Sequence, residues 1–267
     1  MLSFRSPTDA RARIPSHASN SSTFRPHPFV APWRSLPLSV AKGRSVARRF
    51  RLSALLLAAW MTLIPSVGLA QDCLQWADRT PLGTTGPSPR YAHAMAYDSA
   101  RGVTVLFGGV AGPPSYKGDT WEWDGTMWTL RSTTGPSGRY GHVMVYDSAR
   151  GVTVLFGGND GSYKGDTWEW DGTIWSVRST TGPSPRLGHA MAYDSARGVS
   201  VLFGGWALST GWKGDTWEWN GTTWTLRSLT GPSPRRWHAM AYDGGRGVTV
   251  MFGGEDGYTK GDTWEWD

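Results

Sequence analysis

The sequence predicts an all-β protein, a β-propeller of four blades with four short antiparallel strands in each. Three observations lead to this fold class. From residue 87 onward the chain repeats one unit four times, each unit holds four short stretches of alternating or β-branched residues, and glycine-containing turns separate those stretches. The repeats nowhere show the periodicity of a helix.

The repeat is defined by order and spacing together. An arginine opens each unit, and the units begin at Arg90, Arg139, Arg186 and Arg235. Each runs R-x-x-H-x-M-x-Y-D, then R-G-V-x-V-[LM]-F-G-G, a variable loop, and K-G-D-T-W-E-W. A period of this length containing only strands and turns is typical of propeller blades.

In the first unit we expect strands over 93–97, 103–107, 120–123 and 127–131. The second of these is apolar on both faces, as a strand covered on both sides requires, and two glycines end it. Asp124-Gly125 forms a tight hairpin turn between the last two strands, because glycine accepts a positive φ without steric cost.

A heavy aromatic load is expected to fill the space between blades. Residues 71–267 contain 15 of the 17 tryptophans, and each buries on the order of 150–250 Å² when packed. We expect Phe107, Trp121, Trp123, Trp128 and their repeats to form the layers between neighbouring blades.

The ring is predicted to be closed by an N-terminal strand. The fourth unit stops after its third strand, while the stretch 74–79, which contains Trp76, resembles a fourth strand that precedes the first unit. Pairing the two would leave no exposed sheet edge. Two alternatives stay open: a truncated product, or a half-ring that forms a homodimer with a second copy.

The segment before the repeats predicts export. Residues 42–70 combine a basic region, a short apolar run and a small-x-small end, which is typical of a signal peptide. Residues 1–41 are predicted to be a disordered leader or to follow a start placed too early, which leaves 71–267 as the propeller domain. We expect a periplasmic or extracellular protein with no membrane span after cleavage; a retained anchor is the alternative.

Charge and cysteine content narrow the function classes. The whole chain has a formal charge of +6, but residues 1–70 hold ten basic residues and one acidic residue, leaving 17 basic and 20 acidic residues in the domain. This balance disfavours nucleic acid as a partner. Cys73 is the single cysteine, so the domain cannot form an internal disulfide.

The repeats resemble the kelch family. The resemblance rests on R-x-x-H, a strand ending in Gly-Gly and paired aromatics before a final Trp, and it covers residues 74–267. It implies a β-propeller with a predominance of binding roles. Kelch rings usually have six or seven blades, so four units are a departure. Galactose oxidases contain such a propeller, but their copper site uses a cysteine, and no cysteine follows Cys73 here.

Neither a cofactor nor a catalytic constellation is predicted. One histidine recurs on the first strand of each unit, and a ring of four could bind a metal. A repeated packing role is the stronger interpretation, because a residue present in every unit usually serves the fold of every unit. The histidines are His93, His142, His189 and His238.

The variable loops after Gly-Gly are the candidate binding site. Scaffold positions are constrained by packing, whereas loops on one face can specialise. We expect a non-catalytic scaffold that recognises carbohydrate or an extracellular protein there; a sugar-acting isomerase or glycosidase-like enzyme and an adhesion domain are the alternatives. The predicted binding residues are Tyr116, Tyr163, Trp206, Trp212, Arg236, Trp237 and Tyr258.

Overall fold

The computed structural model describes residues 76–80, 86–112 and 115–267, all within a compact unit from Asp72 to Asp267. The predicted leader over 1–41, the predicted signal peptide over 42–70 and Cys73 lie outside the described residues. Within the described ranges, no helix is long and apolar enough to cross a bilayer.

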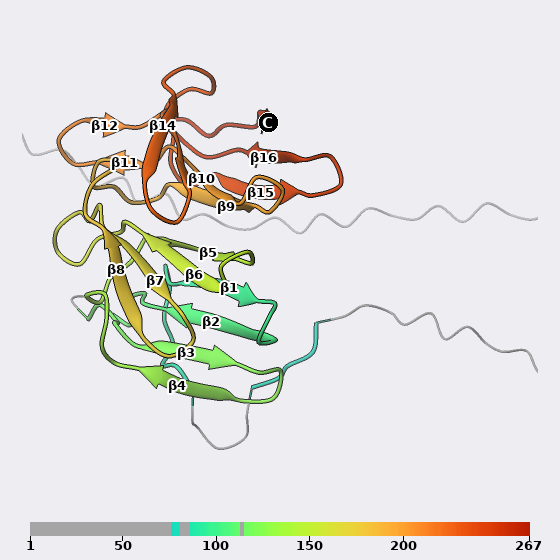
Figure 1. Ribbon diagram of the computed structural model, residues 1–267. Coiled ribbons are helices and arrows are strands. Elements are labelled where there is room, and N and C mark those ends of the chain that lie inside the picture. The colour runs from blue at the N-terminus through green and yellow to red at the C-terminus, as the bar shows by residue number, and fades with distance from the viewer. Residues whose placement is uncertain (1–75, 81–85, 113–114) are drawn as a thin grey trace, which may run out of the picture. The chain divides into compact units, whose positions relative to one another are not determined.

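The described residues form four antiparallel blades, which confirms the predicted all-β propeller architecture (Figure 1). The strands of the first unit fall within one residue of the predicted ranges. The blades consist, in chain order, of β1 (Ala94–Asp98), β2 (Val103–Phe107), β3 (Thr120–Trp123) and β4 (Trp128–Ser132); β5 (Val143–Asp147), β6 (Val152–Phe156), β7 (Thr167–Trp170) and β8 (Trp175–Ser179); β9 (Ala190–Asp194), β10 (Val199–Phe203), β13 (Thr216–Trp219) and β14 (Trp224–Ser228); and β15 (Ala239–Asp243), β16 (Val248–Phe252) and β17 (Thr263–Trp266).

Each sheet follows chain order, with its first strand innermost. The first strands β1, β5, β9 and β15 lie against one another in sequence. The second strands are the core: Val105, Val154 and Val201 are completely buried. This burial is the reason that these strands are β-branched and mostly apolar, with one threonine or serine each, rather than alternating between apolar and charged residues.

One aromatic joint connects each blade to the next. Phe107 of the first blade meets the His142 ring edge-on at 5.6 Å and the Trp175 ring at 5.3 Å, both from the second blade. The Trp175 indole Nε1 also donates to Thr120 Oγ1 at 2.7 Å. The same contacts recur at the next joint, where Trp224 packs on Phe156.

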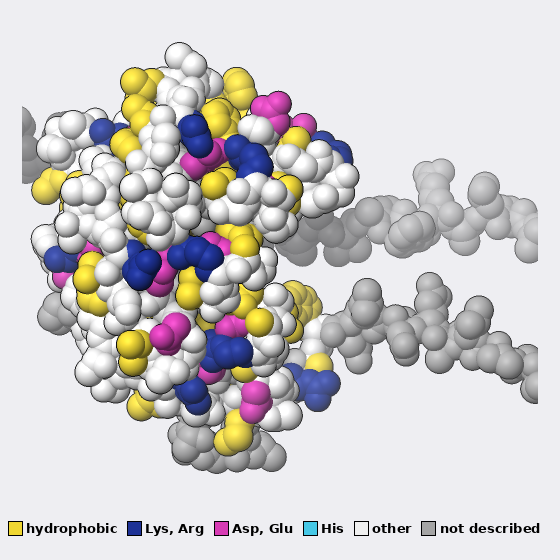
Figure 2. All heavy atoms as spheres, in the orientation of Figure 1, with side chains coloured by type: hydrophobic (Ala, Val, Ile, Leu, Met, Phe, Trp, Pro, Cys, Tyr) yellow, Lys and Arg dark blue, Asp and Glu magenta, His cyan; other side chains and the backbone are white. Residues whose placement is uncertain are grey.

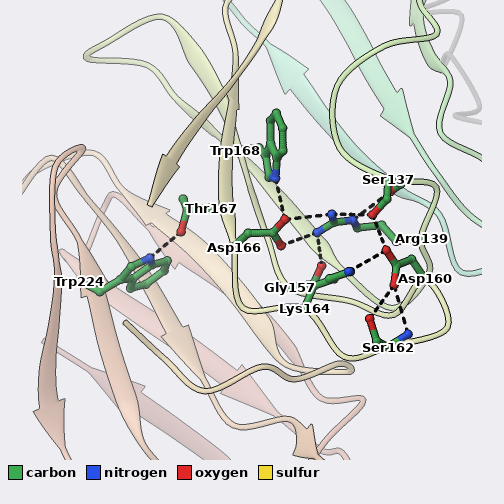
Figure 3. A network of polar contacts seen from close by, with 10 residues as sticks. All are labelled: Ser137, Arg139, Gly157, Asp160, Ser162, Lys164, Asp166, Thr167, Trp168 and Trp224. Carbon is green, nitrogen blue, oxygen red and sulfur yellow. Dashed lines mark hydrogen bonds and ion pairs between the residues drawn. The ribbon is translucent and has the colours of Figure 1, made fainter. Parts of the chain in front are cut away.

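A buried arginine fixes the loops of each blade (Figure 3). Arg139 is 1% exposed and binds Asp166 through both terminal nitrogens, at 2.6 and 3.0 Å. It also donates to the Gly157 carbonyl and to Ser137. The guanidinium therefore joins the segment before the first strand, the end of the second strand and the start of the third through charge-assisted hydrogen bonds.

The predicted closing strand is not formed. Of the stretch 74–79, the structure describes residues 76–79; these adopt no strand, and the Trp76 side chain is fully exposed. No hydrogen bond or ring contact joins the fourth blade to the first within the described ranges, and Phe252 is 55% exposed where Phe107 and Phe156 are completely buried. With Trp76 and Phe252 both exposed, the burial of apolar surface that would hold a fourth strand against β17 is not made.

Removing a buried opening arginine should destabilise the fold strongly. We expect Arg139→Met to lower the free energy of unfolding by about 3 kcal/mol, because it leaves the Asp166 carboxylate without its partner. Arg246→Met is the matched control, since Arg246 also binds an aspartate, Asp243, but is exposed and should hardly change the midpoint. Urea unfolding measures both; similar losses would contradict this role for the buried arginine.

The joint histidines should make the fold sensitive to mild acid. Burial and the nearby charge of Arg139 lower the pKa of His142 to about 3, and burial lowers that of His238 to about 4. Below the ordinary value of 6.5 the unfolded chain binds protons that the fold excludes, so the free energy of unfolding should fall with pH between about 6.5 and 4. Each fully buried histidine should contribute a loss of about 1–2 kcal/mol between pH 7 and pH 5.

The measurement is urea unfolding at pH 7 and pH 5 for the unmodified chain and two variants. His142→Gln should reduce the pH dependence, whereas His93→Gln should reduce it less, because His93 is only partly buried and meets no preceding blade. Equal pH dependence in all three proteins would refute the assignment.

Candidate functional site

The variable loops are attached to the scaffold by a short ladder in each blade. Backbone bridges connect the residue after the opening arginine to the residue after Gly-Gly, and that residue to the end of the loop. In the first blade, for example, the Tyr91 and Val110 amides exchange hydrogen bonds at 3.1 and 2.9 Å. The loops therefore present side chains from fixed backbone positions, as a binding site needs.

The ladders place twelve side chains in a four-by-three array on one face, called here the loop face. These positions differ from blade to blade while the surrounding positions barely change. The array consists of Tyr91, Val110 and Tyr116; Tyr140, Asn159 and Tyr163; Leu187, Trp206 and Trp212; and Arg236, Glu255 and Thr259.

Glycine is required where the ladder meets the first strand. Gly109 has φ of +94°, and a Cβ there would lie 2.8 Å from the Tyr91 carbonyl oxygen. A larger residue would push the ladder away from the blade. This close approach explains the Gly-Gly pair that ends the second strand of every unit.

Tyrosines from the first two blades gather in one cluster. The Tyr116 and Tyr140 rings stack at 5.6 Å with an interplanar angle of 28°. Burial and the neighbouring Tyr116, Tyr163 and Tyr91 hydroxyls raise the pKa of Tyr140, so the Tyr140 phenol stays neutral and can donate a hydrogen bond at physiological pH. We call Tyr91, Tyr116, Tyr140 and Tyr163 the tyrosine cluster.

Tryptophans and one arginine form a second cluster on the last two blades. The Trp206 and Trp212 rings meet edge-on at 4.7 Å. The Arg236 guanidinium carbon lies 4.9 Å from the Trp212 ring centre and 5.6 Å from that of Trp206, while Nε donates to Glu255 at 2.8 Å. These cation–π contacts hold the guanidinium between the aromatic rings. The tryptophan–arginine cluster consists of Trp206, Trp212, Arg236 and Trp237.

Trp237 has an unusual backbone conformation. Its φ is +59°, in the left-handed region; the equivalent residues of the preceding blades are Ala92, with φ of +53°, Gly141 and Gly188. The indole is 51% exposed and lies over Gly188, within 3.2 Å of where a Cβ would stand. A bulky residue in this region is a genuine outlier, and such strain concentrates at binding sites.

The structure brings six of the seven predicted binding residues into these two clusters. Tyr258 is the exception: it is 82% exposed and has no aromatic or cation–π partner within the described residues. Sequence reasoning missed Tyr91 and Tyr140. Their position in the repeat could have indicated them, because each directly follows an opening arginine, as Arg236 does in the fourth unit.

The opposite end of the blades, where the first-to-second-strand turns lie, has a groove that sequence reasoning did not identify. Its volume is about 450 Å³, and it is lined by residues of all four first strands. The tyrosines of the repeated Y-D pair contribute to it from equivalent positions, so its lining barely varies between blades. They are Tyr97, Tyr146, Tyr193 and Tyr242.

The histidine row belongs to the joints rather than to a common site. His142, His189 and His238 each pack edge-on against a phenylalanine of the preceding blade. Among the residues that the structure describes, no three His, Cys, Asp or Glu side chains are grouped so that they could hold a metal ion. These three histidines therefore have a repeated packing role between neighbouring blades.

Charged side chains on the visible face are interspersed by sign (Figure 2). Basic and acidic groups lie next to one another there. Pairing of this kind produces no extended field of one sign on this face.

Comparisons with known proteins identify the family of the chain. The curated proteins contain no match. A solved structure titled "Structure of YjhT" is 13% identical, with a TM-score of 0.46, and the match covers 66% of this chain and 81% of that one. The family described as the KLHDC2/KLHL20/DRC7 Kelch-repeats domain matches residues 119–267, more than half of the chain. The chain therefore belongs to the kelch-repeat family.

Proposed function

We propose that this protein is an exported, non-catalytic scaffold that binds carbohydrate through its loop face. The observation that carries the proposal is the array itself. Variation between blades is concentrated at positions that the ladders hold in place, and aromatic residues occupy six of the twelve. A fold needs no such concentration, because the invariant strands already supply the core.

The chemistry of the two clusters favours a sugar ligand over other ligands. Partly exposed phenol and indole rings offer apolar faces to the C–H groups of a sugar ring, while phenol hydroxyls and the Arg236 guanidinium can bond its hydroxyl groups. Rigid aromatic rings also lose little conformational entropy on binding. An extracellular protein partner would use the same anchors and is the other outcome of the test.

Glycan binding should depend on the tryptophan–arginine cluster. We expect a chain carrying Trp206→Ala, Trp212→Ala and Trp237→Gly to lose at least tenfold in affinity for glycans that the unmodified chain retains, because buried aromatic anchors dominate such interfaces. A glycan array followed by titration calorimetry measures this loss.

Tyr258→Ala is the matched control, since Tyr258 is an exposed aromatic residue of the fourth-blade loop outside both clusters. It should leave the affinity unchanged. Unchanged binding by the triple variant would refute the cluster as the site. A folded chain that binds no glycan would refute carbohydrate as the ligand and direct a search for a protein partner.

The strain at Trp237 should be visible in stability. Trp237→Gly removes the positive-φ penalty, whereas Trp237→Ala keeps the penalty and removes the same ring. We therefore expect the glycine variant to be the more stable of the two by about 1 kcal/mol in urea unfolding. Equal stability of the two variants would show that position 237 stores no strain.

A further inference from the structure

One residue of each blade lies in a backbone row beside the array. Each of these residues directly follows an array residue, the one after the opening arginine, and all four have a positive φ, between +53° and +66°. Their backbones are hydrogen-bonded from blade to blade, with N–O distances of 3.2, 3.0 and 2.7 Å along the row. We call this the inner row; it consists of Ala92, Gly141, Gly188 and Trp237.

The indole of Trp237 lies flat on the inner row. A Cβ added at Gly188 would stand 3.2 Å from both Cδ2 and Cε2 of the indole. These two carbons are shared by the fused rings, so an atom can come this close to both only from above the ring plane. One face of the indole therefore packs on the third blade, and the residue remains half-exposed because the opposite face is open.

The same indole links the two clusters. It belongs to the tryptophan–arginine cluster, and its far edge extends to the second blade, where a Cβ at Gly141 would lie 3.5 Å from Cη2. Gly141 directly follows Tyr140 of the tyrosine cluster. Hydrogen-bonded segments lie about 4.8 Å apart, so the four segments of the row span about 14 Å. The loop face thus offers one continuous aromatic surface rather than two separate sites.

The charges of this surface are paired. Arg236 and Glu255 are the two charged residues among the twelve array positions, and Arg236 Nε donates to Glu255 Oε1 at 2.8 Å. The Tyr140 phenol is neutral as well, because its pKa is raised. With its two charges cancelled, the surface favours a neutral ligand that carries many hydroxyl groups over an anion or a cation.

A flat indole selects among sugars by the C–H groups that they present. A pyranose ring with all substituents equatorial has axial C–H groups on both faces, so either face can stack on the electron-rich face of an indole. An axial hydroxyl would hold the ring away on its own side. Rings of the glucose type therefore fit the open face of Trp237 best, and a β-linked chain repeats such rings along its length.

We propose that the loop face binds a single linear, neutral β-glucan chain that extends across the blades. One glucose unit stacks on Trp237, and the units on either side reach the tyrosine cluster and the Trp206–Trp212 pair. Trp237 is therefore the residue that makes the two clusters act on one ligand. This inference rests on the proposed function, because it names the class of carbohydrate and its place on the loop face.

The measurement is titration calorimetry with two oligosaccharide series, cellobiose to cellohexaose and laminaribiose to laminarihexaose. For at least one series, we expect the affinity of the unmodified chain to rise about tenfold from the shortest to the longest member, because each added unit extends along the same surface. Trp237→Gly should lose this gain, since it removes the linking ring and keeps a backbone conformation that Gly141 and Gly188 already adopt.

A second pair of variants displaces the indole without removing it. The methyl group of Gly188→Ala would crowd the underside of the indole and Arg236 Cβ, each 3.2 Å from the added carbon, so the gain with chain length should fall. Gly198→Ala is the matched control: Gly198 also has φ of +66°, but an added Cβ there would meet nothing within 4 Å. It should have the same backbone strain and keep the full gain.

The outcomes separate this inference from the proposed function. An affinity that does not depend on chain length, or an equal gain in the unmodified chain and Trp237→Gly, would overturn the inference. Binding of neither series by a chain that binds other sugars on a glycan array would overturn the β-glucan assignment and leave the carbohydrate scaffold standing. A folded chain that binds no glycan at all would remove both.

Discussion

A four-stranded blade cannot bury both of its faces, and the contact between neighbouring blades resolves this constraint. The contact is small and repeats almost without change: a phenylalanine meets a histidine and a tryptophan of the following blade, and the indole bonds a threonine hydroxyl. Because the pieces come from two successive repeats, no blade is complete alone. The histidine is neutral for the same reason, since the joint removes it from water.

The buried arginine solves a different problem, that of attaching long loops to short strands. Arg139 and its counterparts join three backbone segments that would otherwise be independent. With these segments fixed, the ladders can present any side chains outward without loss of the fold. This separation allows the tyrosine cluster and the tryptophan–arginine cluster to occupy the same scaffold in different blades, and allows Trp237 to adopt a strained backbone at the last of them.

The sequence by itself determined the blades. Spacing of the opening arginines, the apolar second strands and the Asp-Gly turns predict local strand pairing, which depends on neighbours within one repeat, and the observed strands agree within one residue. It also indicated the loop face, since six of the seven predicted residues lie in the two clusters. Only the tertiary structure decided how these residues group: Tyr91 and Tyr140 lie with the tyrosines of the variable loops, and Tyr258 stands apart, because contacts between the ladders of different blades depend on how neighbouring blades pack. The tertiary structure also decided that the described part of residues 74–79 forms no strand on the fourth blade, because pairing between segments so far apart in the sequence depends on packing that no local pattern of residues encodes.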